Sequence, residues 1–329
     1  MQSRVPNLFD FATSELSQDA ALCWCLAWAD SRHAASDPAM HAIGRDLITS
    51  AFKAADVDPP AGAYAVTIKT QLKHVDIVAE LGDGHVLVIE DKVHSAEHSN
   101  QLNAYAAAIT AIYPERKRAF IFLKTGDQSS YKAVKADSWT TFLRHDLLAV
   151  LRRGSACHNP IYLDFLSLIE SREAAVQRFK STPVSHWGPG DPAYIGLYLQ
   201  LQVLLGDGDW RYVANPSGGF LGFWWHNDGI EGGEIFLQLK EDELVAKIWS
   251  ESAERRRELR GAWSRRVVDA IPGFTRPGRF GNGEYMTVAT HGDYRIAGAD
   301  GRLDLEATVR RLQATADALS RLVAAPPAA

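Results

Sequence analysis

A predicted β-hairpin around residue 83 constrains the fold of this chain of 329 residues more than any other feature of its sequence. Two strand-like segments, 74–81 and 85–91, are joined by the sequence GDG at 82–84, which is a strong turn signal. The second segment contains VLVI at 86–89, a continuous apolar run that is typical of a central strand covered on both faces. The hairpin therefore predicts a sheet in which residues 85–91 form a buried central strand.

Helical and strand-like patterns alternate on both sides of the hairpin, as expected of an α/β fold. The expected elements are, in chain order, helices over 18–30 and 40–54, a strand over 63–70, the hairpin, a helix over 96–113, a strand over 118–124, and helices over 140–153 and 161–179. Pro114 ends the helix that follows the hairpin. The first half of the chain is thus predicted to form one α/β domain.

A segment rich in proline and glycine separates the two halves of the chain. We expect a first domain over 1–181, a linker over 182–192, and a C-terminal α+β domain over 193–329. The elements expected in the second domain are strands over 210–214, 220–226, 234–239, 244–249 and 284–289, and helices over 252–270 and 304–323. No motif assigns a role to this domain.

The composition excludes several classes of protein. Apolar residues make up 46% of the chain and charged residues 23%, which fits a globular protein with a sizeable core. The formal charge of −5 argues against a protein that coats nucleic acid through bulk charge, and three cysteines are too few for a disulfide framework. We find no apolar run long enough to span a bilayer and no signal peptide, so the cytoplasm is the expected location.

Charged residues lie on both strands of the hairpin. Glu90 and Lys92 end the apolar second strand on one face, because successive strand residues alternate. A three-residue turn would place Asp76 opposite Glu90, whereas a two-residue turn would pair it with Asp91, on the wrong face, unless a bulge intervened. Charged side chains at the end of a buried apolar strand are costly unless they serve a function. A functional site is therefore the preferred interpretation, and ordinary solvated charges on a hairpin are the weaker one.

These residue types fit metal-assisted chemistry. Two carboxylates that lie a few ångströms apart repel each other unless a cation lies between them, and hard oxygen ligands favour Mg²⁺ or Mn²⁺. A neighbouring lysine can orient the attacking water or stabilise added negative charge. Gln101 and Tyr105 share one face of the next helix, where an amide and a phenol could bind a phosphate or a metal-bound water.

The combined pattern resembles the PD-(D/E)XK nuclease superfamily over about residues 8–180. The motif stands as VD at 75–76 and EDK at 90–92, with valine in place of the proline. QLNAY at 101–105 is similar to the QxxxY signature of the RecB-type branch, and FATSELSQDA at 11–20 is similar to the start of a bacterial group within the superfamily. The resemblance implies an αβββαβ restriction-endonuclease-like core.

The resemblance also implies roles for individual residues. Lys92 would be catalytic, with Gln101 and Tyr105 supporting the site. The metal ligands would be Asp76, Glu90, the main-chain carbonyl of Asp91 and, as in several branches that use an acid of the first helix, Glu15. Glu15 has a second interpretation, as an acid at a helix entry stabilised by the helix dipole.

Other polar residues near the motif are left open. His94 and His98 are four apart, but a third zinc ligand is lacking, so we expect them to face solvent or DNA. Lys69, Gln71 and Lys73 alternate ahead of Asp76 and either line a substrate groove or form a hydrated strand face.

The second half contains a stretch rich in arginine. We predict that Arg255, Arg256, Arg260 and Arg265 contact phosphates. The alternative is that they pair with acids in 228–254.

Three tryptophans, Trp224, Trp225 and Trp249, could stack bases, but core aromatic residues are the preferred interpretation.

The sequence therefore predicts a nuclease that needs Mg²⁺ or Mn²⁺ and cuts nucleic acid, DNA rather than RNA, in bacterial defence or DNA processing. One alternative is a catalytically inactive module that binds nucleic acid or protein. Another is a nuclease that recognises tRNA or modified DNA through its second domain. The oligomeric state stays open, with a homodimer as one option.

Overall fold

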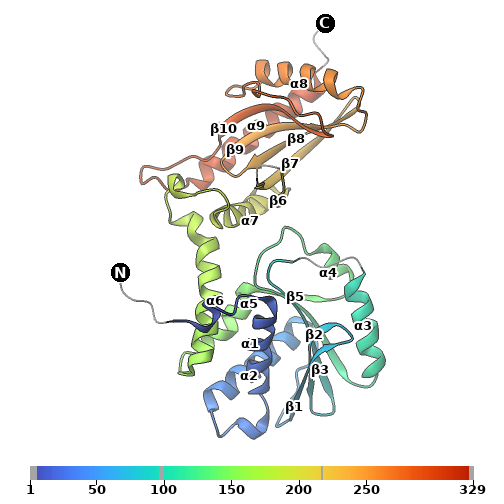
Figure 1. Cartoon of the computed structure of the whole chain (residues 1–329), viewed down its shortest axis with the longest axis vertical. Helices are drawn as coiled ribbons and strands as arrows, with labels where there is room; N and C mark the ends of the chain where they lie inside the picture. The colour runs from blue at the N-terminus through green and yellow to red at the C-terminus, as the bar shows by residue number, and fades with distance from the viewer. Residues whose placement is uncertain (1–5, 96–99, 216–217, 326–329) are drawn as a thin grey trace. The chain divides into compact units, whose positions relative to one another are not determined.

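The computed structural model describes residues 6–95, 100–215 and 218–325 (Figure 1). The chain divides into two compact units, Met1–Ala174 and Ala175–Ala329, and helix α6 (Pro160–Gln177) contains the boundary. This division differs from the predicted limits, because residues 182–192 belong to the second unit and Trp187 is buried in its core. None of the helices that are described is both long and apolar enough to span a bilayer.

The first unit is built around a sheet with the strand order β1-β2-β3-β4-β5. Its strands are β1 (Val66–Leu72), β2 (Val75–Leu81), β3 (His85–Lys92), β4 (Lys117–Lys124) and β5 (Thr140–Leu143). Its helices before α6 are α1 (Glu15–Ala27), α2 (Pro38–Ala54), α3 (Gln101–Ile112), α4 (Lys132–Ala136) and α5 (Arg144–Leu151). The first three strands are antiparallel, and β4 and β5 run parallel to β3 and to each other. The predicted α/β fold is confirmed.

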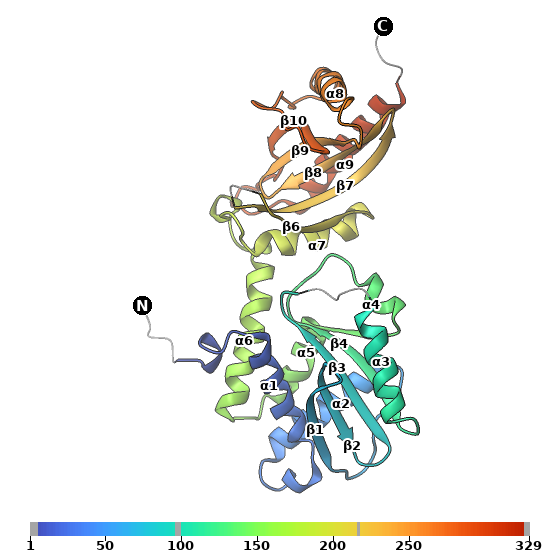
Figure 2. The same ribbon diagram turned by 45° about the vertical axis from the view of Figure 1, so that its right-hand side comes forward.

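Strand β3 lies at the centre of this sheet and is covered on both faces (Figure 2). Leu87 and Ile89 pack into the core formed with α1, α2 and α5, whereas Val86 and Val88 pack with α3 on the other face. Full burial of an aliphatic side chain stabilises the fold by about 1.5–3 kcal/mol. Burial of β3 on both faces therefore explains the continuous apolar run at 86–89, as the sequence predicted.

Local capping residues determine where the first two helices begin. The Ser14 side chain accepts a hydrogen bond from the Ser17 backbone N–H at the start of α1. Asp37 does the same for the Met40 N–H at the start of α2, with Pro38 as the first helical residue. Both helices thus begin a few residues away from the predicted positions, where apolar periodicity alone gave no boundary.

Two helix predictions differ from the structure. Residues 140–143 form β5, paired with β4, and only 144–151 form the helix. Thr140 and Thr141 are β-branched and fit a pleated edge better than a helix. For the helix predicted over 96–113, residues 96–99 lie outside the described residues, and α3 is described from Gln101.

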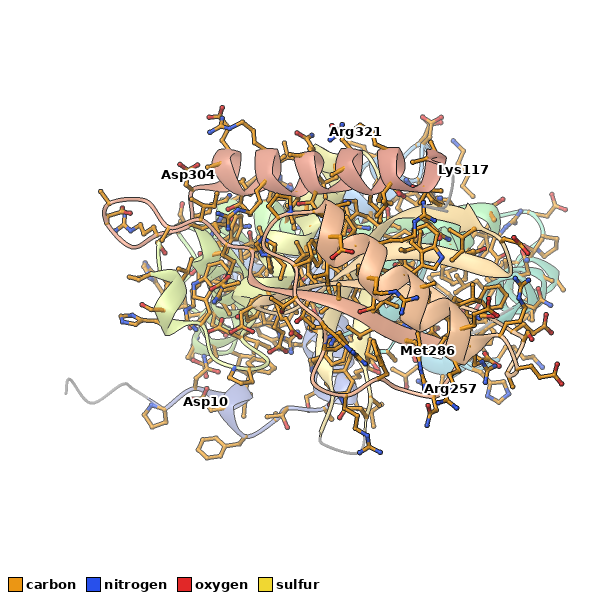
Figure 3. All side chains as sticks on the ribbon, turned by 90° about the horizontal axis from the view of Figure 1, so that it is seen from above. Asp10, Lys117, Arg257, Met286, Asp304 and Arg321 are labelled. Atoms are coloured by element: carbon orange, nitrogen blue, oxygen red, sulfur yellow. The ribbon has the colours of Figure 1, made fainter. Side chains whose placement is uncertain are left out.

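The second unit is an α+β fold with an antiparallel sheet of order β10-β9-β8-β7-β6. Its strands are β6 (Asp209–Val213), β7 (Phe220–Ile230), β8 (Gly233–Lys240), β9 (Glu243–Trp249) and β10 (Tyr285–Asp293), and its helices after α6 are α7 (Ala193–Leu205), α8 (Arg256–Ala270) and α9 (Leu305–Ala324). Figure 3 labels Arg257 near the start of α8 and Arg321 near the end of α9. Helix α7 was not predicted, because its apolar residues show no clear helical period.

Candidate active site

The register of the β2–β3 hairpin brings Asp76 to the end of β3. Leu81 pairs with His85 and Ile77 with Ile89, which confirms the three-residue turn of the two predicted registers. One carboxylate oxygen of Asp76, Oδ2, accepts a hydrogen bond of 3.0 Å from the backbone N–H of Asp91. The turn at residues 82–84 thus sets the register that brings the Asp76 side chain to the backbone of Asp91, 15 residues later in the chain.

The Lys92 ammonium lies between the two carboxylates of the motif. Its Nζ is 2.6 Å from Glu90 Oε1 and 3.2 Å from Asp76 Oδ2. The Glu90 side chain is only 1% exposed, and those of Asp76 and Lys92 are 15% and 13% exposed. The structure therefore brings together all three residues that the sequence predicted as the reaction centre.

Burial determines the protonation of this group. Desolvation raises the pKa of Glu90 to about 7 and the nearby Asp76 charge adds to this, while the hydrogen bond from Lys92 opposes it. Burial alone would lower the pKa of Lys92, but its hydrogen bond to Glu90 and the two carboxylate charges outweigh burial, so its pKa is raised. Lys92 consequently stays a cation at neutral pH in the metal-free site, while Glu90 holds its proton to a higher pH than an ordinary glutamate.

The glutamine and tyrosine of α3 reach the site through Glu90. Gln101 Nε2 lies 3.4 Å from Glu90 Oε1 and donates a hydrogen bond of 2.7 Å to the Tyr105 hydroxyl. The four-residue spacing places both side chains on one helix face, as predicted. Their supporting role in the reaction stays a prediction.

Asp91 points away from this group, into a buried polar cluster. Both of its carboxylate oxygens accept hydrogen bonds from Gln18 Nε2, at 2.6 and 2.9 Å. Asp91 also shares a hydrogen bond with Asp19 of α1. Desolvation, and then the charge of Asp76, raises the pKa of Asp19 to about 6. The sequence did not lead us to predict a role for Gln18 or Asp19. The available signal was two polar residues within an otherwise apolar helical pattern.

Glu15 contacts the backbone beyond β3 and not the Asp76–Glu90 pair. Its Oε1 accepts hydrogen bonds from the N–H groups of Val93, at 2.8 Å, and His94, at 3.1 Å. Burial raises the pKa of Glu15, but these backbone hydrogen bonds outweigh it and the net shift is downward. A role for Glu15 as a metal ligand stays a prediction. The contacts support a second role, in which Glu15 holds the backbone that follows β3. Of the predicted histidine pair, His98 lies outside the described residues.

Of the alternating residues on β1, Gln71 faces the motif. Its Nε2 donates a hydrogen bond of 3.0 Å to Asp76 Oδ1, from a backbone with φ of 56°. Lys69 instead forms an ion pair with Glu80 and lies 3.2 Å from the Tyr113 hydroxyl. Gln71 thus borders the site and Lys69 is held elsewhere, and a substrate-lining role for Lys69, Gln71 and Lys73 stays a prediction.

The donor set fits a divalent metal ion. Glu90 Oε2 is buried and has no hydrogen-bond partner among the residues that the structure describes. A buried acidic oxygen without a partner is costly, and a hard cation would satisfy it. Within the same residues no third histidine, cysteine or acidic side chain completes a cluster, so the Asp91 carbonyl and water are the remaining candidates.

Three of the four predicted phosphate-binding arginines have partners within the second unit. Arg255 pairs with Glu231 at 3.0 Å, and Arg256 donates to the carbonyl oxygens of residues 250 and 251. Arg260 donates to the Gly281 carbonyl oxygen at 2.6 Å. Arg265 is exposed on α8. Their binding to nucleic acid stays a prediction. Of the alternative pairs with acids in 228–254, the Arg255–Glu231 pair is present, whereas Arg256 lies 3.6 Å from Glu284.

The family model described as the PD-(D/E)XK nuclease superfamily matches residues 6–179 of the chain. These residues include Asp76, Glu90 and Lys92 and the two α3 side chains next to them. The match does not separate the RecB-type branch from others. Comparisons with curated proteins and with solved structures return no match.

Proposed function

The chain belongs to the PD-(D/E)XK nuclease superfamily, and from this premise we propose that it is a nuclease dependent on Mg²⁺ or Mn²⁺. Members of this superfamily generally hydrolyse phosphodiester bonds. The observation that carries the proposal is the contact of Lys92 Nζ with both Asp76 and Glu90 at the end of a buried central strand. Each charged position of the superfamily motif is kept in this chain.

Asp76 and Glu90 are the side chains that would hold the ion. A divalent ion bound there would polarise a phosphoryl oxygen and lower the pKa of a bound water. Glu90 must lose its proton to act as a ligand, and the nearby Lys92 charge favours that loss. Gln101 fixes the orientation of Glu90 through its amide, and Tyr105 holds the amide in turn.

Lys92 would act through its charge. In the metal-free site the hydrogen bond to Glu90 and the charges of Glu90 and Asp76 raise its pKa, so the ammonium is protonated at neutral pH. A largely buried ammonium would stabilise the negative charge that develops on the phosphoryl oxygens. Lys92 would therefore contribute to the transition state rather than to binding in the ground state.

The substrate is proposed to be nucleic acid, with DNA before RNA, in bacterial defence or DNA processing. The three cysteines are free thiols, which suits the reducing cytoplasm. The test is incubation of the full chain with labelled single- and double-stranded DNA and RNA, with Mg²⁺ and with a chelator. We expect cleavage of DNA that depends on the metal, and a protein that binds these substrates without cutting any of them would contradict the proposal.

A further inference from the structure

The sheet of the second unit has two unlike faces. Core residues from its five strands, among them Trp210, Phe223, Leu237, Ala246 and Met286, form one cluster with buried residues of α7, α8 and α9. Helix α9 crosses this face of the sheet (Figure 1). Because successive side chains of a strand alternate, the residues next to these lie on the opposite face.

We call this opposite side the open face, and it carries an unusual set of side chains. Its members are Arg211, Trp224, Phe236, Lys247, Trp249 and Tyr285. Among the described residues, none of the four aromatic ones belongs to the core cluster or packs against it. The solvent-facing side of an antiparallel sheet is usually polar, so four aromatic rings there call for an explanation.

Strand register sets these side chains next to one another across the sheet. Phe236 pairs with Lys247, and Trp249 pairs with Tyr285. The rings of Phe236 and Tyr285 are 6.3 Å apart and nearly perpendicular, and the Tyr285 side chain is 61% exposed. Phe236, Trp249 and Tyr285 thus lie together across β8, β9 and β10. Trp224 of β7 pairs with Gln238 and continues the row of aromatic positions on this face.

Two cations lie in this row without an acidic partner in the described part of the chain. The Lys247 ammonium is 6.0 Å from the centre of the Tyr285 ring, and the Arg211 guanidinium is 5.4 Å from the Trp224 ring. Burial, and then the nearby charge of Lys240, lowers the pKa of Lys247 to about 8. A half-buried ammonium with no counter-ion is costly, and an anionic ligand would remove that cost.

The acidic side chains Glu234 and Glu243 of the same face already have partners. Glu243 forms an ion pair with Lys240 at 3.4 Å, and Glu234 accepts a hydrogen bond of 2.8 Å from Asn227. Among the described residues, neither acid pairs with Lys247 or Arg211, so both cations could bind an anionic ligand.

Two further observations point to a ligand with polar edges. Gln238 is paired in register with Trp224, is 4% exposed, and leaves its Oε1 without a hydrogen-bond partner among the described residues. A pocket of about 460 Å³ lies beside Trp249 at the other end of the row, and Arg255 also lines it. The row therefore combines flat rings, cations and an unused acceptor.

We propose that the open face binds single-stranded nucleic acid, with bases stacked on the four aromatic rings and phosphates beside Arg211 and Lys247. This inference rests on the proposed function and adds the form of nucleic acid that the second unit holds. Bases in a duplex are stacked on each other and do not offer their faces, whereas bases of a single strand can stack on aromatic side chains. Trp225 is in the core as expected, whereas Trp224 and Trp249, which were also expected there, lie outside the core cluster and would take this role.

The test measures binding of the full chain to fluorescein-labelled dT20 by anisotropy, in a chelator so that cleavage cannot consume the probe. Replacing Trp224 and Trp249 with leucine keeps an apolar side chain and removes the π surface, whereas phenylalanine keeps both. We expect each Trp→Leu change to weaken binding by about five- to a hundredfold and each Trp→Phe change to have a small effect. Tyr212→Leu is the control, because Tyr212 is 60% exposed on the same sheet but outside the open face.

Charge is tested separately with Lys247→Gln. We expect the slope of log affinity against log salt to become shallower by about 0.7. Arg310→Gln, at an exposed position on α9, should leave the slope unchanged. Equal binding by the leucine, phenylalanine and wild-type proteins would overturn the inference. So would a dT20·dA20 duplex that competes for the protein as well as single-stranded dT20 does.

The two proposals can fail independently. A wild-type protein that cuts DNA while both leucine variants bind dT20 normally would overturn the inference and leave the nuclease function standing. A wild-type protein that cuts no nucleic acid but binds dT20 through the two tryptophans would overturn the nuclease function and support the inference.

Discussion

The Lys92 ammonium lies 2.6 Å from the Glu90 carboxylate, and Glu90 is almost completely buried. The ion pair does not fully offset desolvation, because the pKa of Glu90 is still raised to about 7. The site is therefore electrostatically strained when Glu90 is ionised, and the predictions below follow from that strain.

Stability of the metal-free protein should fall as the pH rises through this site's titration. The folded protein keeps the Glu90 proton up to about pH 7, whereas the unfolded chain releases it near the ordinary value of 4.5. Between these values the folded state binds more protons, so the free energy of unfolding decreases with rising pH, by up to about 3 kcal/mol. Glu90→Gln removes this titration and should raise the melting temperature at pH 8 by a few degrees, but hardly at pH 5.

Thermal unfolding in a chelator at both pH values checks this. Glu115→Gln is the control, since Glu115 is exposed. A Glu90→Gln protein that melts at the wild-type temperature at both pH values would show that the Glu90 charge is not strained.

Asp76→Asn should reduce the affinity for Mg²⁺ or Mn²⁺ by at least about tenfold, because one of two carboxylate ligands is lost. The amide oxygen of the substituted side chain could still accept a hydrogen bond from the Asp91 N–H, so the hairpin register should survive. Titration calorimetry with Mn²⁺ measures the change, with Asp58→Asn as a control at an exposed carboxylate. Undiminished affinity in Asp76→Asn would place the ion elsewhere.

Glu15→Gln distinguishes a clamp from a ligand. If Glu15 serves only to hold the Val93 and His94 N–H groups, the change should cost about 1 kcal/mol of stability and leave Mn²⁺ affinity within a factor of about two. Because the folded-state pKa of Glu15 is lowered, its contribution to stability is present above pH 4.5 and is lost as the pH falls below that. A tenfold loss of Mn²⁺ affinity would instead make Glu15 a ligand.

The parts of the site that are close in sequence could be predicted, and the parts joined by packing could not. The turn at 82–84 and strand alternation determine how Asp76, Glu90 and Lys92 meet, and these signals are local. The contact between Asp19 and Asp91 depends on how α1 packs on β3, which no short-range pattern encodes. In the fold, β5 was missed for the same reason, since its partner β4 decides its conformation.

The arginines at the start of α8 show the same limit. Their density predicted contacts with phosphates or with nearby acids, and in the structure Arg255 and Arg256 contact Glu231 and the turn after β9. The partners are 24 and 6 residues away in the chain, so charge counting along one stretch could not identify them.

The most direct measurement is the single-turnover rate of DNA cleavage by Lys92→Ala in saturating Mg²⁺. The account predicts a loss of at least about two to three orders of magnitude, because the ammonium stabilises charge in the transition state. Mn²⁺ affinity should persist, and Lys117→Ala, at a half-exposed lysine paired with Asp58, should cleave at the wild-type rate. Wild-type cleavage by a folded Lys92→Ala protein would contradict the assignment of this site.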